Sequence, residues 1–120
     1  MLKTILMADD DPTLVRIVQH TLEDAGYRVL TAHDGEEALK KLESECIDLV
    51  ILDVQMPKVH GYSFIFQMRK IEGRHDVPVI VLTASRDMKD IFMAEGVKEY
   101  LVKPCSAKEL LAKIKLYLNP

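Results

Sequence analysis

Apolar residues along the chain fall into short continuous runs that alternate with helical repeats. Five short runs predict β-strands. Three of the five are almost continuously apolar, which is typical of strands buried on both faces of a parallel sheet. The predicted strands cover residues 4–8, 28–32, 49–53, 78–83 and 100–102.

The segments that follow these runs predict five helices. The candidate helices cover residues 12–25, 34–42, 62–71 and 88–95, and a last one that begins after Ser106. Their ends carry recognisable cap signals. These signals are an N-cap at Asp11 before Pro12, a stop at Gly26, and capping boxes at Asp34 with Glu37 and at Ser106 with Glu109.

A strand followed by a helix, repeated five times, predicts an α/β fold. Because crossovers between parallel strands are right-handed, the expected architecture is a doubly wound parallel sheet with helices on both faces. The chain has 120 residues, enough for one domain with a sizeable core and too few for two ordinary domains. We therefore expect residues 1–120 to form one domain, with no effector domain in this chain.

Composition and charge exclude several classes of protein. Apolar residues make up 48% and charged residues 29% of the chain, and the net charge of −3 gives no basic patch for nucleic acid. No apolar run approaches the roughly 20 residues of a membrane span. Cys46 and Cys105 lack the spacing of a disulfide framework or a zinc site. The sequence predicts a cytoplasmic protein that binds neither nucleic acid nor membrane directly.

Chemically active side chains follow four of the five predicted strands. Asp9 and Asp10 follow the first strand, Asp53 ends the third, Thr83 ends the fourth and Lys103 follows the fifth. Ligands of doubly wound sheets bind at the carboxyl ends of the strands. The sequence therefore predicts that three carboxylates, a hydroxyl and an ammonium group meet at one edge.

This combination of groups favours phosphoryl chemistry. Three clustered carboxylates form a hard, oxygen-rich site that suits Mg²⁺. A lysine ammonium can bridge a carboxylate and an anion, and a threonine hydroxyl can donate a hydrogen bond to a phosphoryl oxygen. A carboxylate can itself be the nucleophile and form an aspartyl-phosphate.

Four segments of the chain resemble the signature segments of the response-regulator receiver domain, the phospho-acceptor half of two-component signalling. They read "ILMADDDP", "LVILDVQMPKVHGY", "VIVLTAS" and "EYLVKP", and the resemblance spans essentially all 120 residues. It implies a flavodoxin-like fold with five strands in the order 2-1-3-4-5, flanked by five helices.

The resemblance implies a role for each matching residue around a phosphorylated aspartate. Asp53 is the position of the phospho-acceptor, and Asp9 and Asp10 are the positions of the acidic pair that holds Mg²⁺. Gln55, two residues after Asp53, supplies a backbone carbonyl to the metal in that family.

The resemblance also implies a switch. Thr83 takes the position of the switch hydroxyl, Lys103 that of the lysine of the family, and Tyr100 that of an aromatic residue that rotates from exposed to buried. The Lys103–Pro104 bond is expected to be cis. The partners implied are a sensor histidine kinase or histidine phosphotransfer protein, and a downstream protein or effector domain.

One segment departs from the pattern of the family. The segment between Thr83 and Lys103 is slightly shorter than is usual, and the shortening falls in residues 85–100, around the predicted fourth helix. The fourth helix, fifth strand and fifth helix form the usual output surface of the family. The partner surface is therefore not carried over.

Other interpretations of the same residues are possible. Asp11 is explained by its N-cap role alone, and Tyr100 is also compatible with a static core position. A haloacid-dehalogenase-like phosphatase needs an aspartate where this chain has Gln55, and a flavin module needs a Ser-, Thr- and Gly-rich loop where it has "ADDDP". The alternative kept open is a receiver-like docking module that is not phosphorylated.

Overall fold

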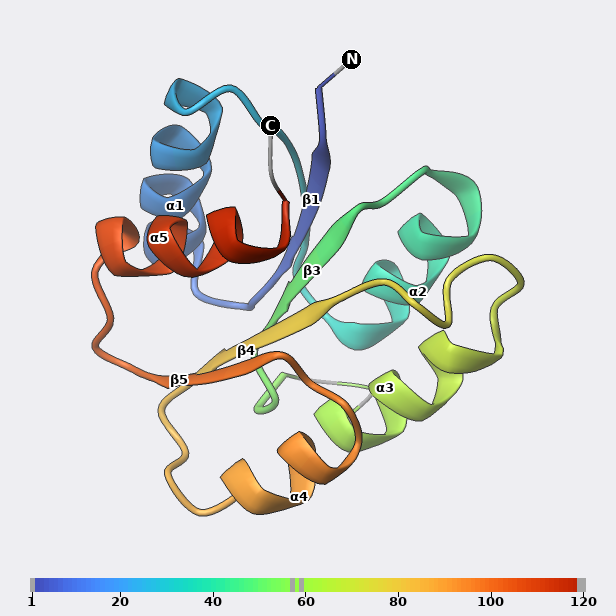
Figure 1. Ribbon diagram of the computed structural model, residues 1–120. Helices are drawn as coiled ribbons and strands as arrows, with labels where there is room; N and C mark the ends of the chain where they lie inside the picture. The colour runs from blue at the N-terminus through green and yellow to red at the C-terminus, as the bar shows by residue number, and fades with distance from the viewer. Residues whose placement is uncertain (1, 57, 59, 119–120) are drawn as a thin grey trace.

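The computed structural model describes residues 2–56, 58 and 60–118, which form a central sheet flanked by helices (Figure 1). All strand pairs are parallel, and the strand order is β2-β1-β3-β4-β5. The strands are β1 (Thr4–Ala8), β2 (Arg28–Ala32), β3 (Leu49–Leu52), β4 (Val79–Thr83) and β5 (Glu99–Val102). The helices are α1 (Pro12–Asp24), α2 (Gly35–Ser44), α3 (Gly61–Lys70), α4 (Lys89–Ala94) and α5 (Ala107–Tyr117).

This topology confirms the predicted α/β fold and its strand order. The bounds of β1 and β2 match the predictions, and the other bounds differ by at most two residues. Strand β3 ends before Asp53, although the Asp53 amide still donates to the carbonyl of Ala8 on β1 at 2.9 Å. Strand β4 begins after Pro78, whose carbonyl accepts from the amide of Val50 at 3.0 Å. Local patterns locate an element well, whereas the last ladder bonds depend on the neighbouring strand.

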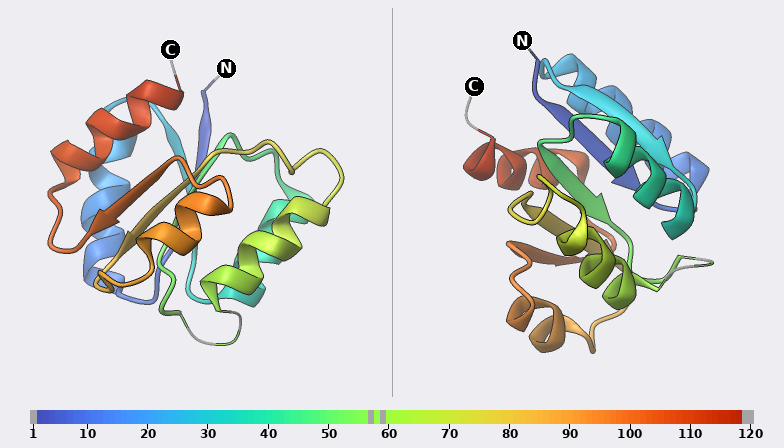
Figure 2. Two further views of the ribbon diagram at one scale, coloured as in Figure 1. Left: turned by 60° about the horizontal axis from the view of Figure 1, so that its bottom comes forward. Right: turned by 90° about the vertical axis from the view of Figure 1, so that its right-hand side faces the viewer.

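Two hydrophobic layers hold the helices on opposite faces of the sheet (Figure 2). Helices α1 and α5 pack on one face, where the buried side chains include Val18, Leu22 and Ile114. Helices α2, α3 and α4 cover the other face around the fully buried Phe64 and the nearly fully buried Phe92. Because both faces are covered, every residue of β1, β3 and β4 is buried, which explains their continuous apolar runs.

The predicted cap chemistry is largely confirmed. The Asp11 carboxylate accepts hydrogen bonds from the amides of Thr13 and Leu14 at the start of α1. The capping box of α5 is complete in both directions. That of α2 is displaced by one residue: the Asp34 carboxylate accepts from the amide of Glu37, but the Glu37 carboxylate accepts from the amide of His33.

Two further observations concern the cysteines and the length of the helices. Cys46 and Cys105 are both free, with Cys46 exposed and Cys105 half-buried. Among residues 2–56, 58 and 60–118, no helix has the length and apolar character needed to cross a membrane.

Candidate functional site

Three carboxylates meet at the carboxyl edge of the sheet, between β1 and β3. One oxygen each from Asp9, Asp10 and Asp53 lies within 4.8 Å of the other two. Their environments differ sharply: Asp9 is 1% exposed and Asp53 is 5% exposed, whereas Asp10 faces solvent. Neighbouring carboxylates repel one another, so this cluster requires a positive charge.

Lys103 supplies a positive charge from the end of β5. Its Nζ donates to Asp9 Oδ2 at 2.9 Å and to Asp53 Oδ2 at 3.2 Å. The lysine side chain is only 22% exposed, so its charge is weakly screened by water. Lys103 thus bridges the two buried carboxylates and leaves the exposed carboxylate of Asp10 at the open side.

Burial and pairing shift the pKa values of this pair of side chains. Burial raises the pKa of Asp9 above its ordinary value, and the hydrogen bonds from Lys103 and from the amide of Asp11 do not fully offset that cost. For Lys103, burial lowers the pKa, but the hydrogen bond and charge of Asp9 together with the charge of Asp53 outweigh it. The pKa of Lys103 is therefore raised.

The raised pKa of Asp9 predicts that its ionised carboxylate lowers the stability of the folded protein. An ionised Asp9 is less favourable in the folded than in the unfolded protein, so Asp9→Asn is expected to increase the free energy of unfolding at pH 7 by about 1 kcal/mol. The gain shrinks as the pH falls through the raised pKa of Asp9. It vanishes below the unfolded value of 3.8, because the wild-type carboxyl group is then protonated in both states. Urea unfolding of both proteins at several pH values measures this difference, and a loss of stability at every pH would contradict it.

The same backbone turn follows three of the strands. The amide of Asp11 donates to Asp9 Oδ1 at 2.9 Å, and the amide of Gln55 donates to Asp53 Oδ1 at 2.9 Å. After β4, the amide of Ser85 lies 3.4 Å from Thr83 Oγ1. In each case the residue at the strand end is held by the amide two residues on. These turns orient side chains that the strands alone only bring to one edge.

Ser85 also links Thr83 to Tyr100. Thr83 is fully buried, and Tyr100 is 8% exposed. The Tyr100 hydroxyl donates to the backbone carbonyl of Ser85 at 2.6 Å. The structure therefore has Tyr100 at the buried end of the rotation that the sequence resemblance implies.

Two further features fix the segments around the site. The Lys103 amide donates to the carbonyl of Thr83 at 2.8 Å, and the Lys103–Pro104 peptide bond is cis, as predicted. On the other side, Gly61 at the start of α3 lies against Val54, the residue after Asp53. A Cβ atom at position 61 would lie 2.7 Å from Val54 Cα. Sequence reasoning missed this contact, although a glycine eight residues after Asp53 was its one visible signal.

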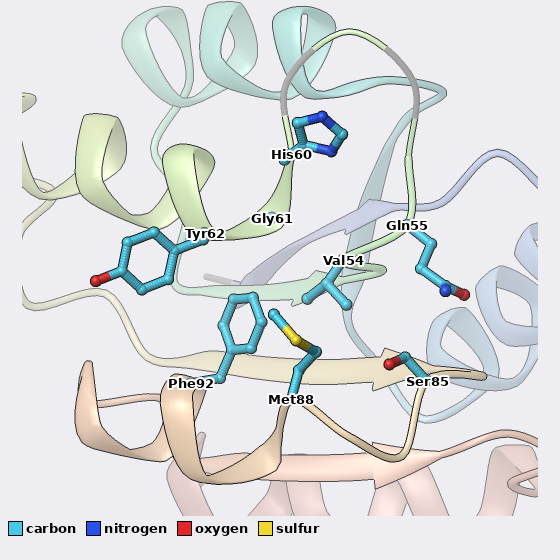
Figure 3. A pocket seen from close by; sticks show the side chains of 8 residues that line it. All are labelled: Val54, Gln55, His60, Gly61, Tyr62, Ser85, Met88 and Phe92. Carbon is cyan, nitrogen blue, oxygen red and sulfur yellow. The ribbon is translucent and has the colours of Figure 1, made fainter.

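A cavity of about 320 Å³ lies beside the acidic cluster, between the segment after β3 and helix α4 (Figure 3). Gln55 and Ser85 line its end nearest the site, and Tyr62 and Phe92 line the other end. Val54 and Met88 lie between them (Figure 3). The cavity therefore lies between Gln55 and Ser85, which adjoin the site residues Asp53 and Thr83, and Phe92 of α4.

The structure brings the predicted site residues to one edge. Asp9, Asp10, Asp53 and Lys103 form one connected group. Thr83 and Tyr100 are joined to each other through Ser85. Gln55 adjoins Asp53 through its backbone amide, and its carbonyl stays a predicted rather than an observed ligand.

Comparison with known proteins covers almost the whole chain. The sequence profile of the response regulator receiver domain matches residues 5–115. The chain is 41% identical over 121 residues to the alkaline phosphatase synthesis transcriptional regulatory protein PhoP of Bacillus subtilis (strain 168), covering 99% of this chain and 50% of that protein. It is 44% identical over 119 residues to the probable transcriptional regulator ycf27 of Cyanophora paradoxa, covering 98% and 48%. The chain thus spans about half the length of the curated relatives it matches.

Solved structures agree with the fold. The chemotaxis response regulator CheY4 of Vibrio cholerae superimposes with a TM-score of 0.90 at 34% identity, covering 98% of this chain and 100% of that chain. The response regulator protein TrrA of Thermotoga maritima, solved in complex with Mg²⁺ and BeF, gives a TM-score of 0.87 at 38% identity with the same coverage. The family profile, the curated relatives and the fold agree: this chain belongs to the response regulator receiver domain family.

Proposed function

We propose that the domain is a phosphorylation-activated switch in which Asp53 accepts a phosphoryl group from a phosphohistidine. The observation that carries this proposal is the Lys103 bridge between Asp9 and Asp53 beside an exposed third carboxylate. If Lys103 served only a structural ion pair, the third carboxylate of Asp10 would add repulsion at this edge without adding a stabilising contact. An anion and a divalent cation that enter together would use all four groups.

The donor set fits Mg²⁺. Asp10 and Asp53 would hold the ion together with the Gln55 backbone carbonyl, and Asp9 would contribute directly or through water. Mg²⁺ favours a few carboxylates plus water and phosphate oxygens, and the exposed position of Asp10 leaves room for such ligands. When bound, the ion neutralises charge that would otherwise repel an incoming phosphoryl group.

The proposed chemistry is an in-line phosphoryl transfer. A carboxylate oxygen of Asp53 attacks the phosphorus, a new P–O bond forms, and the P–N bond to the imidazole breaks. Lys103 lies 3.2 Å from Asp53 Oδ2, so its ammonium can pair with the transferred group with little movement. The contribution of the protein is mainly positioning and electrostatic stabilisation.

The proposed switch begins at Thr83. When its hydroxyl donates to a phosphoryl oxygen, Thr83 moves inward and changes its contact with Ser85, whose carbonyl holds the hydroxyl of Tyr100. The surface of α4, β5 and α5 then changes, and a partner binds it differently. This is a two-state element biased by a local change of charge. The proposed partners are a histidine kinase or histidine phosphotransfer protein and a downstream protein or effector domain.

Incubation with acetyl phosphate tests the proposal. With Mg²⁺, intact mass spectrometry is expected to show one added phosphoryl group per chain, stable in acid and lost in alkali as for an acyl phosphate. With excess EDTA, the yield should fall by at least about tenfold, because three carboxylates then face the incoming anion.

Two outcomes contradict parts of this proposal. An equal yield in EDTA would remove the role of the metal. The alternative of a docking module that is not phosphorylated would be favoured by two results together. The protein would form no adduct, and its nuclear magnetic resonance spectrum would not change on addition of Mg²⁺ and beryllofluoride.

A further inference from the structure

Helix α4 is short and is held at its far end by a contact with α3. It spans six residues, Lys89–Ala94, and its N-cap residue is Met88, which has no oxygen to cap the helix. At the other end, the C-cap residue Glu95 accepts a hydrogen bond from the Tyr62 hydroxyl at 2.8 Å. Tyr62 lies in the first turn of α3. The contact therefore ties the end of α4 to the start of α3.

The same tyrosine contacts the one buried side chain of α4. The rings of Tyr62 and Phe92 meet edge to face, with centroids 6.1 Å apart and planes at 71°. Figure 3 shows the two rings together at one end of the cavity, away from Gln55 and Ser85. The hydrogen bond to Glu95 also raises the pKa of Tyr62, as expected when a carboxylate holds the phenol proton.

Phe92 also contacts Tyr100. The centroids of these two rings are also 6.1 Å apart, with planes at 33°. Phe92 of α4 thus contacts one ring from α3 and one from β5, and we call these three rings the aromatic bridge: Tyr62, Phe92 and Tyr100. Aromatic pairs at this separation stabilise each other beyond simple burial. A shift of Phe92 would therefore change the packing around the buried Tyr100 ring.

We propose that Tyr62 and Glu95 are positioning residues for the switch, because their hydrogen bond holds α4 where Phe92 stabilises Tyr100 in its buried position. The proposal rests on the proposed function for the role of Tyr100. It adds a second control on that residue, from α3, which is separate from the control exerted by Thr83 through Ser85. A hydrogen bond that stabilises one conformation also strengthens the binding of any ligand that prefers that conformation. The Tyr62–Glu95 hydrogen bond should therefore favour ligands that bind the domain with Tyr100 buried.

Removing a single hydroxyl group tests this proposal in the unliganded protein. Tyr62→Phe keeps the ring against Phe92 and deletes only the hydrogen bond to Glu95. The control is Tyr27→Phe, because the Tyr27 hydroxyl donates to the backbone carbonyl of Leu118 at 3.3 Å and both residues lie in the layer of α1 and α5, on the other face of the sheet. Glu95→Gln retains an acceptor oxygen and should resemble the wild type.

Two measurements report the result. Hydrogen exchange of the α4 amides is expected to become about three- to tenfold faster in Tyr62→Phe. This is the change expected when a single hydrogen bond at the protein surface is lost. In protein labelled at its tyrosine and phenylalanine rings, the nuclear Overhauser contacts between Tyr100 and Phe92 are expected to weaken. Tyr27→Phe should change neither the α4 exchange nor the ring contacts.

The outcomes separate this proposal from the function on which it rests. If Tyr62→Phe changes the α4 exchange no more than Tyr27→Phe does, the hydrogen bond between Tyr62 and Glu95 does not hold α4 in place. If the α4 exchange accelerates while the Tyr100–Phe92 contacts stay constant, the Tyr62–Glu95 hydrogen bond does not act on Tyr100, and the proposal is overturned. A wild-type protein that takes up no phosphoryl group would contradict the proposed function without altering either measurement.

Discussion

Asp53→Asn is expected to eliminate the phosphoryl adduct formed with acetyl phosphate and Mg²⁺, lowering its rate of formation by at least about a hundredfold. The amide is nearly the same size as the carboxylate but has no anionic oxygen to attack phosphorus. Its single oxygen can still accept one of the two hydrogen bonds that the Gln55 amide and Lys103 donate to different oxygens of Asp53, and Lys103 keeps its bond to Asp9. The fold should therefore be retained while the chemistry is lost.

The other end of the same strand offers a matched control. Asp48 precedes β3 and accepts a hydrogen bond from the amide of Thr4 at 2.7 Å, at the edge of the sheet away from the site. Asp48→Asn makes the same chemical change and should form the adduct at the wild-type rate. An adduct that persists in Asp53→Asn would move the phospho-acceptor to Asp9 or Asp10, which the same mass measurement on Asp9→Asn and Asp10→Asn would identify.

Gly61→Ala is expected to lower the free energy of unfolding by about 2 kcal/mol, or the Tm by roughly 5–10 °C. The new methyl group would lie 2.6 Å from Val54 Cβ and 2.7 Å from Val54 Cα. Since one of these atoms belongs to the backbone, a change of side-chain rotamer cannot relieve the contact. The helix-forming advantage of alanine over glycine is at most about 1 kcal/mol and does not offset this clash.

The displacement caused by Gly61→Ala should also reach the site. Val54 separates Asp53 from Gln55, so a shift of its backbone disturbs the amide that orients Asp53 Oδ1. We expect slower adduct formation from the folded variant at a temperature below its Tm. Ser63→Ala, an exposed position in the same helix, should change stability by less than about 0.5 kcal/mol. If Gly61→Ala matched that control, the close approach of α3 to Val54 would not limit stability.

The fold was predictable because its signals are local. Apolar runs flanked by cap residues identified the five strands and five helices that the structure describes, and right-handed crossovers predicted the doubly wound arrangement. Parallel strands end at one edge of the sheet, so the order of elements is enough to place the chemical groups that follow those strands together. Element bounds were less accurate, since the last hydrogen bonds of a strand depend on the strand beside it.

The different environments of adjacent acidic residues were not predictable in this way. Asp9 is buried and paired whereas Asp10 is exposed, although both follow the same strand. The difference arises because side chains alternate between the two sides of an extended segment. Which side is closed depends on Lys103, 94 residues away in the sequence.

The sequence by itself determined the strand and helix order, the edge at which the chemical groups meet and the types of group present there. The tertiary structure alone decided that Lys103 joins Asp9 to Asp53, that Gly61 lies against Val54, and that Tyr62 reaches Glu95 across 33 positions. Periodicity and capping are properties of neighbouring residues and can be recognised in a single chain. Contacts between side chains on different elements depend on how those elements pack, and no local pattern encodes that geometry.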